Sequence, residues 1–536
     1  MFKIKLIIFL FSSLQLFSQV TQDWVSRYNG SGNGIDVGKS IAVDGSGNVY
    51  VTGESPGNGT GKDYATIKYN SSGVQQWVSI YNGTGNTEDI AISVAVDGAG
   101  NVYVTGYSWG GSSNYDYATV KYNSSGIEQW VQRYNAADGY DYAHSIALDG
   151  SDNVYVTGES VGSGGNFDYA TIKYNSSGVQ QWVGRYNGLQ NGSDYANSIA
   201  VDGSGNVYVT GRVQWSGNDN DYGTLKYNTS GVLQWDHIYN GPGNDWDEAF
   251  SIAVDGSGNV YVTGYSTSSG SLSDYATLKI NSSGVGQWAS RYTGPGNSSD
   301  RAYSIAVDGL GNSYVTGRSF GSGSDWDYGT IKYNSSGAEQ WVGRYNGLFN
   351  AEDLAYSIAV DGSGNVYVTG TSFGIYTDYA TVKYSSSGVQ QWAARYNGPG
   401  NFSDNANSIA LDGSGNVYVT GSSFGISHDY ATIKYSQPIG IKPVSTEIPN
   451  GYKLSQNYPN PFNPTTKIRF ALPKSSFAKL VVYDALGREM ETIVNEQLNA
   501  GTYEADWSAD KFSSGVYYYK IQTADFNQTK KMILIK

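Results

Sequence analysis

One aspartate recurs at a fixed place along most of the chain, eight residues before the aspartate of a phrase such as "AVDG". The series consists of Asp36, Asp89, Asp141, Asp194, Asp247, Asp300, Asp353 and Asp404. Eight carboxylates in one place could bind Ca²⁺ or another hard cation, because such ions take oxygen ligands. A residue present in every repeat is more often part of the fold, and here it would cap a turn by accepting backbone N–H bonds. We favour capping, keep a cation-binding ring as the alternative, and expect no other cofactor.

Large aromatic residues occur in stretches that differ from one repeat to the next. They are Trp109, Trp215, Trp246, Trp326, Phe349 and Phe402. Aromatic faces beside Asn and Asp suit sugars, which offer apolar ring faces and hydroxyl rims. The sequence therefore predicts that these residues bind a ligand. The alternative is that they pad loops against one another.

Residues for catalysis are harder to find. His144, His237 and His428 occupy unrelated repeat positions, and there is no Cys, so no metal cluster or catalytic triad follows from spacing. A glycosidase or lyase needs two well-placed carboxylates. The acids that do not recur in every repeat include Glu54, Glu159, Asp219 and Glu248. No pair stands out among them, so we lean towards a protein that is not an enzyme.

The elements that position these residues follow from internal repetition. "AVDGSGNVYVTG" at 42–53 and "DYATIKYN" at 63–70 each recur eight times, and the first recurs in steps of 51 to 53 residues. Each repeat splits into four strand-like runs joined by short Gly, Asn and Ser turns, which accept the positive φ of hairpins. A period of this size with four antiparallel strands is typical of a propeller blade. We expect an all-β protein with an eight-bladed β-propeller over residues 19–436.

The two ends of the repeat region complement each other. The eighth repeat stops after its third run, "DYATIKYS" at 429–436. Residues 23–29, in contrast, match the fourth run of a repeat and have no first three runs before them. We expect this N-terminal strand to complete the last blade, since closure removes two open sheet edges.

The connections between strands predict two different faces. The first-to-second and third-to-fourth turns are uniform, and they lie together on one face of a four-stranded meander. The second-to-third loops and the connections to the next blade lie on the other face, and they vary in length and content. We name the second one the variable face and expect binding there, because loops on a rigid scaffold carry function.

The repeated "SIAVDGSGNVYVTG" and "DYATIKYNSSGVQQW" resemble the bacterial SBBP β-propeller repeats over residues 21–436. The family name implies seven blades, whereas the repeats here number eight. The resemblance implies a propeller fold and names no activity.

The C-terminal residues differ in composition from the repeats. Residues 437–450 contain three prolines and read as a linker, and residues 451–536 alternate like the strands of a small immunoglobulin-like β-sandwich. "NYPNPFNPTTKIRF" at 457–470, "VYDALGRE" at 482–489 and the terminal "TKKMILIK" resemble the type A sorting domain of the type IX secretion system. The resemblance implies the secretion machinery as a partner and export to the surface of a Gram-negative bacterium, often with removal of this domain. The alternative is an ordinary immunoglobulin-like binding module.

The N-terminus and the overall composition agree with export. Lys3 and Lys5 precede an apolar run from Leu6 to Phe17, which predicts a signal peptide over residues 1–18. The 70 Gly, 47 Tyr and 13 Trp suit many short strands. A net charge of -14 argues against nucleic acid and anionic membranes as partners. With its edges closed, the chain is expected to be a monomer.

These observations combine into one functional hypothesis. We expect a secreted or cell-surface propeller, not an enzyme, that binds an extracellular glycan or protein through its variable face. A purely structural spacer is the alternative, suggested by how little the blades differ. A polysaccharide hydrolase or lyase is the less favoured third hypothesis.

Overall fold

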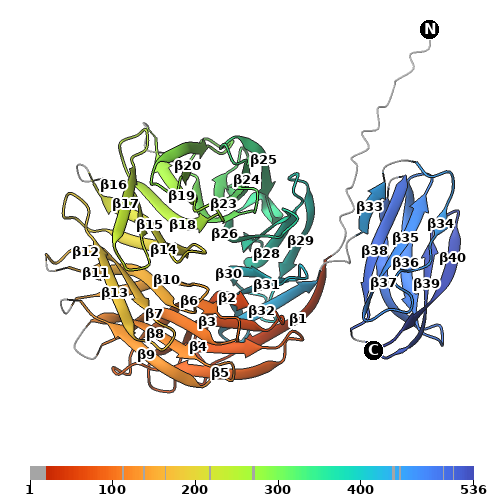
Figure 1. Ribbon diagram of the computed structural model, residues 1–536, viewed down its shortest axis with the longest axis horizontal. Coiled ribbons are helices and arrows are strands. Elements are labelled where there is room, and N and C mark those ends of the chain that lie inside the picture. The colour runs from red at the N-terminus through yellow and green to blue at the C-terminus, as the bar shows by residue number, and fades with distance from the viewer. Residues whose placement is uncertain are drawn as a thin grey trace, which may run out of the picture. The chain divides into compact units, whose positions relative to one another are not determined.

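The computed structural model of the chain is all-β (Figure 1). It describes residues 20–110, 114–136, 139–162, 164–215, 219–268, 272–436, 441–445, 448–498, 500–510 and 512–536. The predicted signal peptide lies outside these residues. Contacts divide the chain into two compact units, one of Gln22–Ser436 and one that holds Gln437–Lys536. In the described part of the chain, no helix is long and apolar enough to cross a membrane.

The first unit consists of eight four-stranded sheets, which confirms the eight predicted blades. Blade 1 contains β2 (Val37–Val43), β3 (Val49–Pro56), β4 (Lys62–Tyr69) and β5 (Gln75–Tyr81). Blade 2 contains β6 (Asp89–Val96), β7 (Val102–Trp109), β8 (Tyr115–Tyr122) and β9 (Glu128–Tyr134). Blade 3 contains β10 (Asp141–Leu148), β11 (Val154–Val161), β12 (Phe167–Tyr174) and β13 (Gln180–Tyr186). Blade 4 contains β14 (Tyr195–Val201), β15 (Val207–Gln214), β16 (Asn220–Tyr227) and β17 (Leu233–Tyr239).

The remaining four blades repeat this order, with one short 3₁₀ turn, η1 (Leu348–Asn350), between blades 6 and 7. Blade 5 contains β18 (Asp247–Val254), β19 (Val260–Thr267), β20 (Ser273–Ile280) and β21 (Gly286–Tyr292). Blade 6 contains β22 (Arg301–Val307), β23 (Ser313–Phe320), β24 (Trp326–Tyr333) and β25 (Glu339–Tyr345). Blade 7 contains β26 (Asp353–Val360), β27 (Val366–Phe373), β28 (Thr377–Tyr384) and β29 (Gln390–Tyr396). Blade 8 contains β30 (Asp404–Leu411), β31 (Val417–Phe424), β32 (His428–Ser436) and β1 (Thr21–Tyr28).

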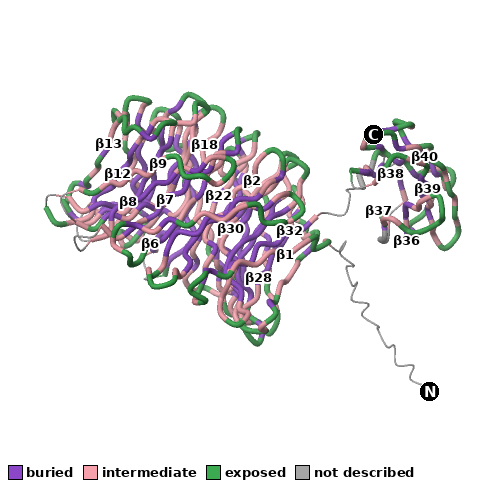
Figure 2. The backbone as a smooth tube through the Cα atoms, turned by 90° about the horizontal axis from the view of Figure 1, so that it is seen from below, coloured by how far each residue is buried: buried purple, intermediate pink, exposed green. Residues whose placement is uncertain are grey.

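The first strand of every repeat is the innermost strand of its blade (Figure 1). Each innermost strand contacts those of the two neighbouring blades, and β2 contacts β30, so the ring closes. Burial follows the middle strands, while the turns and loops at both faces are exposed (Figure 2). The innermost strands therefore bring one part of every repeat to a common centre.

The last blade is completed by β1, as the orphan strand predicts. Arg27 of β1 forms an ion pair with Asp429 of β32, with 2.8 Å between Nη2 and Oδ2. The indole of Trp24 lies 6.2 Å from the rings of both Tyr69 and Tyr418, so it bridges blades 1 and 8. The sequence-distant ends of the propeller are thus held by contacts that recur in most of the other blades.

The uniform turns form because their polar side chains replace missing backbone partners. Asp44 Oδ1 accepts hydrogen bonds from Ser46 N and Asn48 N, each at 2.9 Å, and Gly47 between them has a φ of 75°. Asn70 does the same in the third-to-fourth turn of blade 1, accepting from Ser72 N and Val74 N. These are side-chain-capped hairpins of the kind that Asp, Asn and Gly favour.

Neighbouring blades pack through buried aromatic and aliphatic side chains. Tyr50 and Tyr64 of blade 1 lie in one cluster with Val102 and Val104 of blade 2, all fully buried. The Tyr64 hydroxyl also donates a hydrogen bond of 3.2 Å to the carbonyl of Ala118 in blade 2. The middle strands are covered on both sides, which explains why their sequence is apolar on both faces.

The second unit is a small sandwich of two four-stranded sheets, in the orders β33-β38-β35-β34 and β37-β36-β39-β40. Its strands are β33 (Ile441–Ser445), β34 (Lys453–Leu454), β35 (Thr465–Leu472), β36 (Ser476–Tyr483), β37 (Glu489–Leu498), β38 (Gly501–Ser508), β39 (Gly515–Gln522) and β40 (Asn527–Leu534). One core joins the sheets, with Phe470 and Trp507 from the first against Leu480 and Tyr519 from the second.

One segment differs from its predicted role. Residues 437–450 read as a linker, but 441–445 form β33, which pairs antiparallel with β38. Pro443 fits this place because β33 is an edge strand, where a missing N–H breaks no ladder on the outer side. The proline pattern does not reveal this long-range pairing.

Candidate functional site on the variable face

A bulge at the start of every innermost strand aims one residue out of the ladder. In blade 1 the pairing passes from Gly38 with Gly53 to Ser40 with Thr52, which leaves Lys39 unpaired. Gly53 is required there, because an added Cβ would lie 1.9 Å from the carbonyl oxygen of Val37. The bulged position varies among the blades: Lys39, Ile92, His144, Asn197, Phe250, Tyr303, Tyr356 and Asn407. A uniform scaffold therefore presents different side chains around one centre.

The eight aspartates of the first series cap turns. In each blade a carboxylate accepts a hydrogen bond from the backbone N–H six residues earlier, or five in blade 3, in the connection from the previous blade. Asp300, for example, accepts from Gly294 N at 2.6 Å and from Phe320 N at 2.7 Å. All eight are buried. These contacts tie the variable-face connections to the strand starts, as the favoured capping interpretation expects.

The eight aspartates do not converge on one point in the described structure. Among the described residues, no group of three or more His, Asp or Glu side chains is placed to hold a metal ion. Burial raises the pKa of four of the eight aspartates to about 6, although their hydrogen bonds lower it in part. These four are Asp36, Asp141, Asp194 and Asp353. The carboxylates are isolated in separate blades.

Aromatic side chains form a continuous arc over blades 2 to 4 on the variable face. Successive ring centroids lie 5.1 Å apart between Trp109 and Tyr115, 5.7 Å between Tyr115 and Tyr142, 6.2 Å between Tyr142 and Phe167, and 5.5 Å between Phe167 and Tyr195. Tyr140, which is 42% exposed, stacks on Tyr142 with an interplanar angle of 2°. We name this row of rings the aromatic arc.

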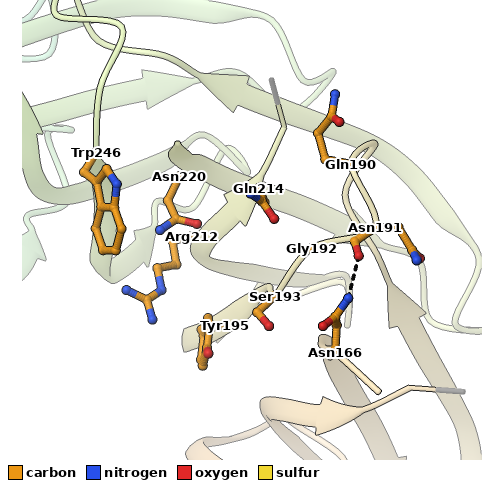
Figure 3. A pocket seen from close by; sticks show the side chains of 10 residues that line it. All are labelled: Asn166, Gln190, Asn191, Gly192, Ser193, Tyr195, Arg212, Gln214, Asn220 and Trp246. Atoms are coloured by element: carbon orange, nitrogen blue, oxygen red, sulfur yellow. Dashed lines mark hydrogen bonds between the residues drawn. The ribbon is translucent and has the colours of Figure 1, made fainter. Parts of the chain in front are cut away.

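The aromatic arc ends at a polar hollow of about 470 Å³ over blade 4 (Figure 3). Arg212 lies between two rings there, with its guanidinium carbon 4.1 Å from the Tyr195 centroid and 5.8 Å from that of Trp246. The wall opposite Trp246 includes Asn191, whose carbonyl oxygen accepts a hydrogen bond of 2.7 Å from Asn166 Nδ2. The other lining residues are Gln190, Gly192, Ser193, Gln214 and Asn220.

The predicted aromatic residues divide into exposed and packed members. Trp246, Phe349 and Phe402 are exposed, at 47%, 73% and 46%. Trp109, Trp215 and Trp326 are half-buried. The structure brings Trp109 into the arc and Trp246 to the hollow, and it leaves Phe349 at η1 and Phe402 against Tyr376 and Phe424 on the far side of the ring.

The three non-repeated glutamates lie in separate blades, each beside a different partner, while Asp219 lies in the loop before β16 and, together with burial, raises the pKa of Asp221. Glu54 forms ion pairs with Lys39 and Lys62, at 3.5 and 3.0 Å. Glu159 pairs with His144 at 2.5 Å, and Glu248 with Arg212 at 3.6 Å. A glycosidase mechanism needs one carboxyl as acid and a second as base or nucleophile. The three glutamates lie in three blades, 1, 3 and 5, and each contacts a lysine, histidine or arginine side chain.

The tyrosines of the arc and the bulged residues did not emerge from the sequence. Tyr115, Tyr142 and Tyr195 stand beside invariant Asp residues and read as part of the repeat. A position-by-position comparison of the eight repeats finds them, because the neighbours of those aspartates vary while the aspartates do not. Their convergence depends on the curvature of the ring.

Comparison with known proteins agrees with this architecture. Eight segments match the SBBP β-propeller repeat, at residues 23–59, 76–112, 129–166, 181–212, 237–270, 287–322, 350–377 and 391–425. Residues 456–536 match the secretion system C-terminal sorting domain. No curated protein sequence matches the chain.

Several solved structures resemble the chain. One is PorZ, an essential bacterial surface component of the type IX secretion system of Porphyromonas gingivalis, at 15% identity and a TM-score of 0.41, with 92% of this chain and 74% of that chain covered. The propeller domain of the Trilobed protease from Pyrococcus furiosus matches at 8% identity and 0.37, with 67% and 97% covered. A protein of unknown function from Bacteroides thetaiotaomicron matches at 11% and 0.30, with 78% and 98% covered.

The two family matches account for both units. The sorting domain marks proteins exported by the type IX secretion system, which reach the cell surface or the extracellular space of Gram-negative Bacteroidetes. The matched repeat segments are spread around the ring, from the closing strand β1 to β31 of blade 8. The chain belongs to the SBBP β-propeller repeat proteins and carries a type IX secretion sorting domain at its C-terminal end.

Proposed function

We propose that this chain is a surface-exposed or released binding protein that holds an extracellular polysaccharide along the aromatic arc and in the hollow over blade 4. The observation that carries the proposal is the row of ring contacts from Trp109 to Tyr195, which leads to Arg212 and Trp246. Aromatic faces spaced along a surface suit successive sugar rings, and the amides of the hollow suit hydroxyl groups.

The position of the arc supports the same proposal. It lies on the face where the repeats differ, while the opposite face carries nearly identical turns in every blade. A spacer needs no difference between the two faces, since the packing between blades depends only on the repeated residues. Export to the cell surface exposes the arc to extracellular polymers.

Affinity electrophoresis of the chain without residues 1–18, in gels that contain neutral or acidic polysaccharides, tests the proposal. We expect retardation by at least one polysaccharide class and about a three- to tenfold weaker affinity for Trp246→Ala, since one aromatic contact is worth about 0.5–1.5 kcal/mol. Phe349→Ala is the matched control, because Phe349 is exposed but lies outside the arc. Equal migration in every gel would overturn the proposal in favour of a spacer or a protein partner.

A further inference from the structure

Two arginines lie directly opposite each other in blade 6, at the edge of the variable face. Arg301 of β22 pairs with Arg318 of β23 in the antiparallel register. Like charges at directly opposite positions destabilise a sheet. The same register position holds Tyr195 and Arg212 in blade 4 and Glu248 and Tyr265 in blade 5, which attract each other.

In the described part of the chain, the cationic pair in blade 6 makes no direct ion pair, and the nearby carboxylate of Glu352 acts on Tyr303 and Tyr356 together with Arg318. Among the described residues neither Arg301 nor Arg318 forms an ion pair, and the Nε atoms of both are buried without a hydrogen-bond partner. The arginines that recur in the fourth strands of the blades differ from this pair because they have carboxylate partners. Arg344 in the fourth strand of blade 6, for example, pairs with Asp327 at 2.8 Å. Blade 6 thus keeps two charges that its own stability does not require.

The free guanidinium groups are held in place by aromatic rings. Arg301 lies 4.5 Å from the centroid of Tyr265, and Arg318 lies 4.6 Å from that of Trp326. Trp326 is fixed in turn, because its Nε1 donates a 2.9 Å hydrogen bond to the carbonyl of Ser299. Stacking orients the planar guanidinium and leaves its N–H edges for bidentate contacts to an oxyanion.

The pair in blade 6 is continuous with the hollow over blade 4. Tyr265 carries Arg301 on its ring and donates a 3.4 Å hydrogen bond to Glu248, which lies 3.6 Å from Arg212. This cluster holds three arginines against two glutamates, Glu248 and Glu352, in a chain of net charge -14. An anionic polymer is repelled by much of such a surface and is steered towards cationic patches such as this cluster.

From these contacts we infer that the site takes an acidic polysaccharide, whose carboxylate or sulfate groups bind Arg212, Arg301 and Arg318 while its sugar rings lie on the aromatic arc. The inference rests on the proposed function and names the ligand class of that site. The aromatic arc favours a glycan over an acidic peptide, because each acidic sugar unit offers both an apolar ring face and an anionic group.

Isothermal titration with polygalacturonate and with its fully methyl-esterified form tests the inference, because the two share one sugar backbone and the ester replaces each charged carboxylate by a neutral methyl ester. We expect at least about tenfold tighter binding of the acid form, and a loss of that preference as NaCl is raised. Arg301→Gln and Arg318→Gln are expected to lower affinity at least about tenfold, with Arg318→Lys retaining part of it. Lys39→Gln, which removes a cation over blade 1, is the control. A second pair of titrations, with dextran sulfate and with dextran, tests the same preference for sulfate groups.

The outcomes separate this inference from the proposed function. Equal affinity for charged and neutral forms, with loss in Trp246→Ala, would refute the inference and leave the glycan site intact. Equal binding of polyglutamate would refute a polysaccharide ligand. Binding of no glycan at all would overturn both. Melting temperatures of the glutamine variants within about 3 °C of wild type show that a lost affinity is not lost folding.

Discussion

At the scale of residues, one ion pair shows how the propeller tolerates variation. In blade 3, Arg185 of β13 binds Asp168 of β12 at 2.9 Å and also donates to the Ser160 hydroxyl. The same Arg–Asp pair occurs in blades 2, 5, 6, 7 and 8. Blade 4 replaces the arginine by Ile238 and the serine by Val213, which join the apolar core beside Asp221. Asp221 is left without its cation.

Restoring this ion pair is expected to stabilise the propeller. Asp221 is almost fully buried, and burial, with the charges of Asp247 and Asp219, raises its pKa to about 7. Folding raises the pKa of Asp221, so the protonated carboxyl group stabilises the fold at acid pH. The unfolding free energy therefore falls as the pH rises from about 4 to about 7. The double variant Val213→Ser/Ile238→Arg should raise the melting temperature at pH 7.5 and flatten this slope.

The single variants Val213→Ser and Ile238→Arg serve as controls for the double variant. Each leaves the network incomplete, so denaturant unfolding at pH 5 and 7.5 should show a gain only when both changes are present. A double variant less stable than wild type at pH 7.5 would mean that the apolar replacement already compensates for the lost pair.

The capping role of the aspartate series makes a second prediction for single residues. Asp300→Ala removes the acceptor of the N–H groups of Gly294 and Phe320. Leaving two buried donors unpaired costs about 1–3 kcal/mol each, so we expect at least about 2 kcal/mol of lost stability by urea unfolding. The wild-type melting temperature should be the same in Ca²⁺ and in chelator. A rise of several degrees with Ca²⁺ alone would favour a cation ring.

At the scale of elements, β1 is the strand on which ring closure depends. Its contacts to blade 8 include the Arg27–Asp429 ion pair and the hydrogen bond from Ser436 to Asp23. Deletion of residues 21–30 exposes the edge of β32, so we expect a lower melting temperature and oligomers in size-exclusion chromatography with light scattering. A synthetic peptide of residues 21–30 should restore the monomer. A truncated chain that stays monomeric with unchanged melting would contradict closure by β1.

Elements also mark the limit of what the sequence predicts. Strands and turns are predictable because they depend on local chemistry, since Asp44 and Asn70 cap their own turns. The blade number and the closure by β1 are predictable because the repeats can be compared with one another, and the last repeat lacks the run that residues 23–29 supply. The pairing of 441–445 with β38 is not, because its partner lies about 60 residues away and Pro443 hides it. The candidate site is only partly predictable from the sequence. Trp246 is predictable as a variable aromatic residue, whereas Arg301 opposite Arg318 appears only once the register is known.

At the scale of the whole molecule, one half of the variable face differs from the other. Blades 1 and 3 carry the contacts Lys39–Glu54 and His144–Glu159, whereas the two opposed arginines of blade 6 form no ion pair among the described residues. The ring makes this possible, because eight equivalent positions can change one at a time while the packing between blades is kept. Function in this chain is therefore expected where the repeats disagree.

Hydrogen exchange by mass spectrometry most directly tests the claim that ligand binds along the aromatic arc. The chain without residues 1–18 would be measured with and without oligosaccharides of the polysaccharide that retards it most. We predict slowed exchange at 107–109, 140–142, 193–195, 212–214 and 246–248, all on the variable face. Protection confined to the uniform turns, such as 44–48 and 70–74, or no protection at saturating ligand, would contradict the account.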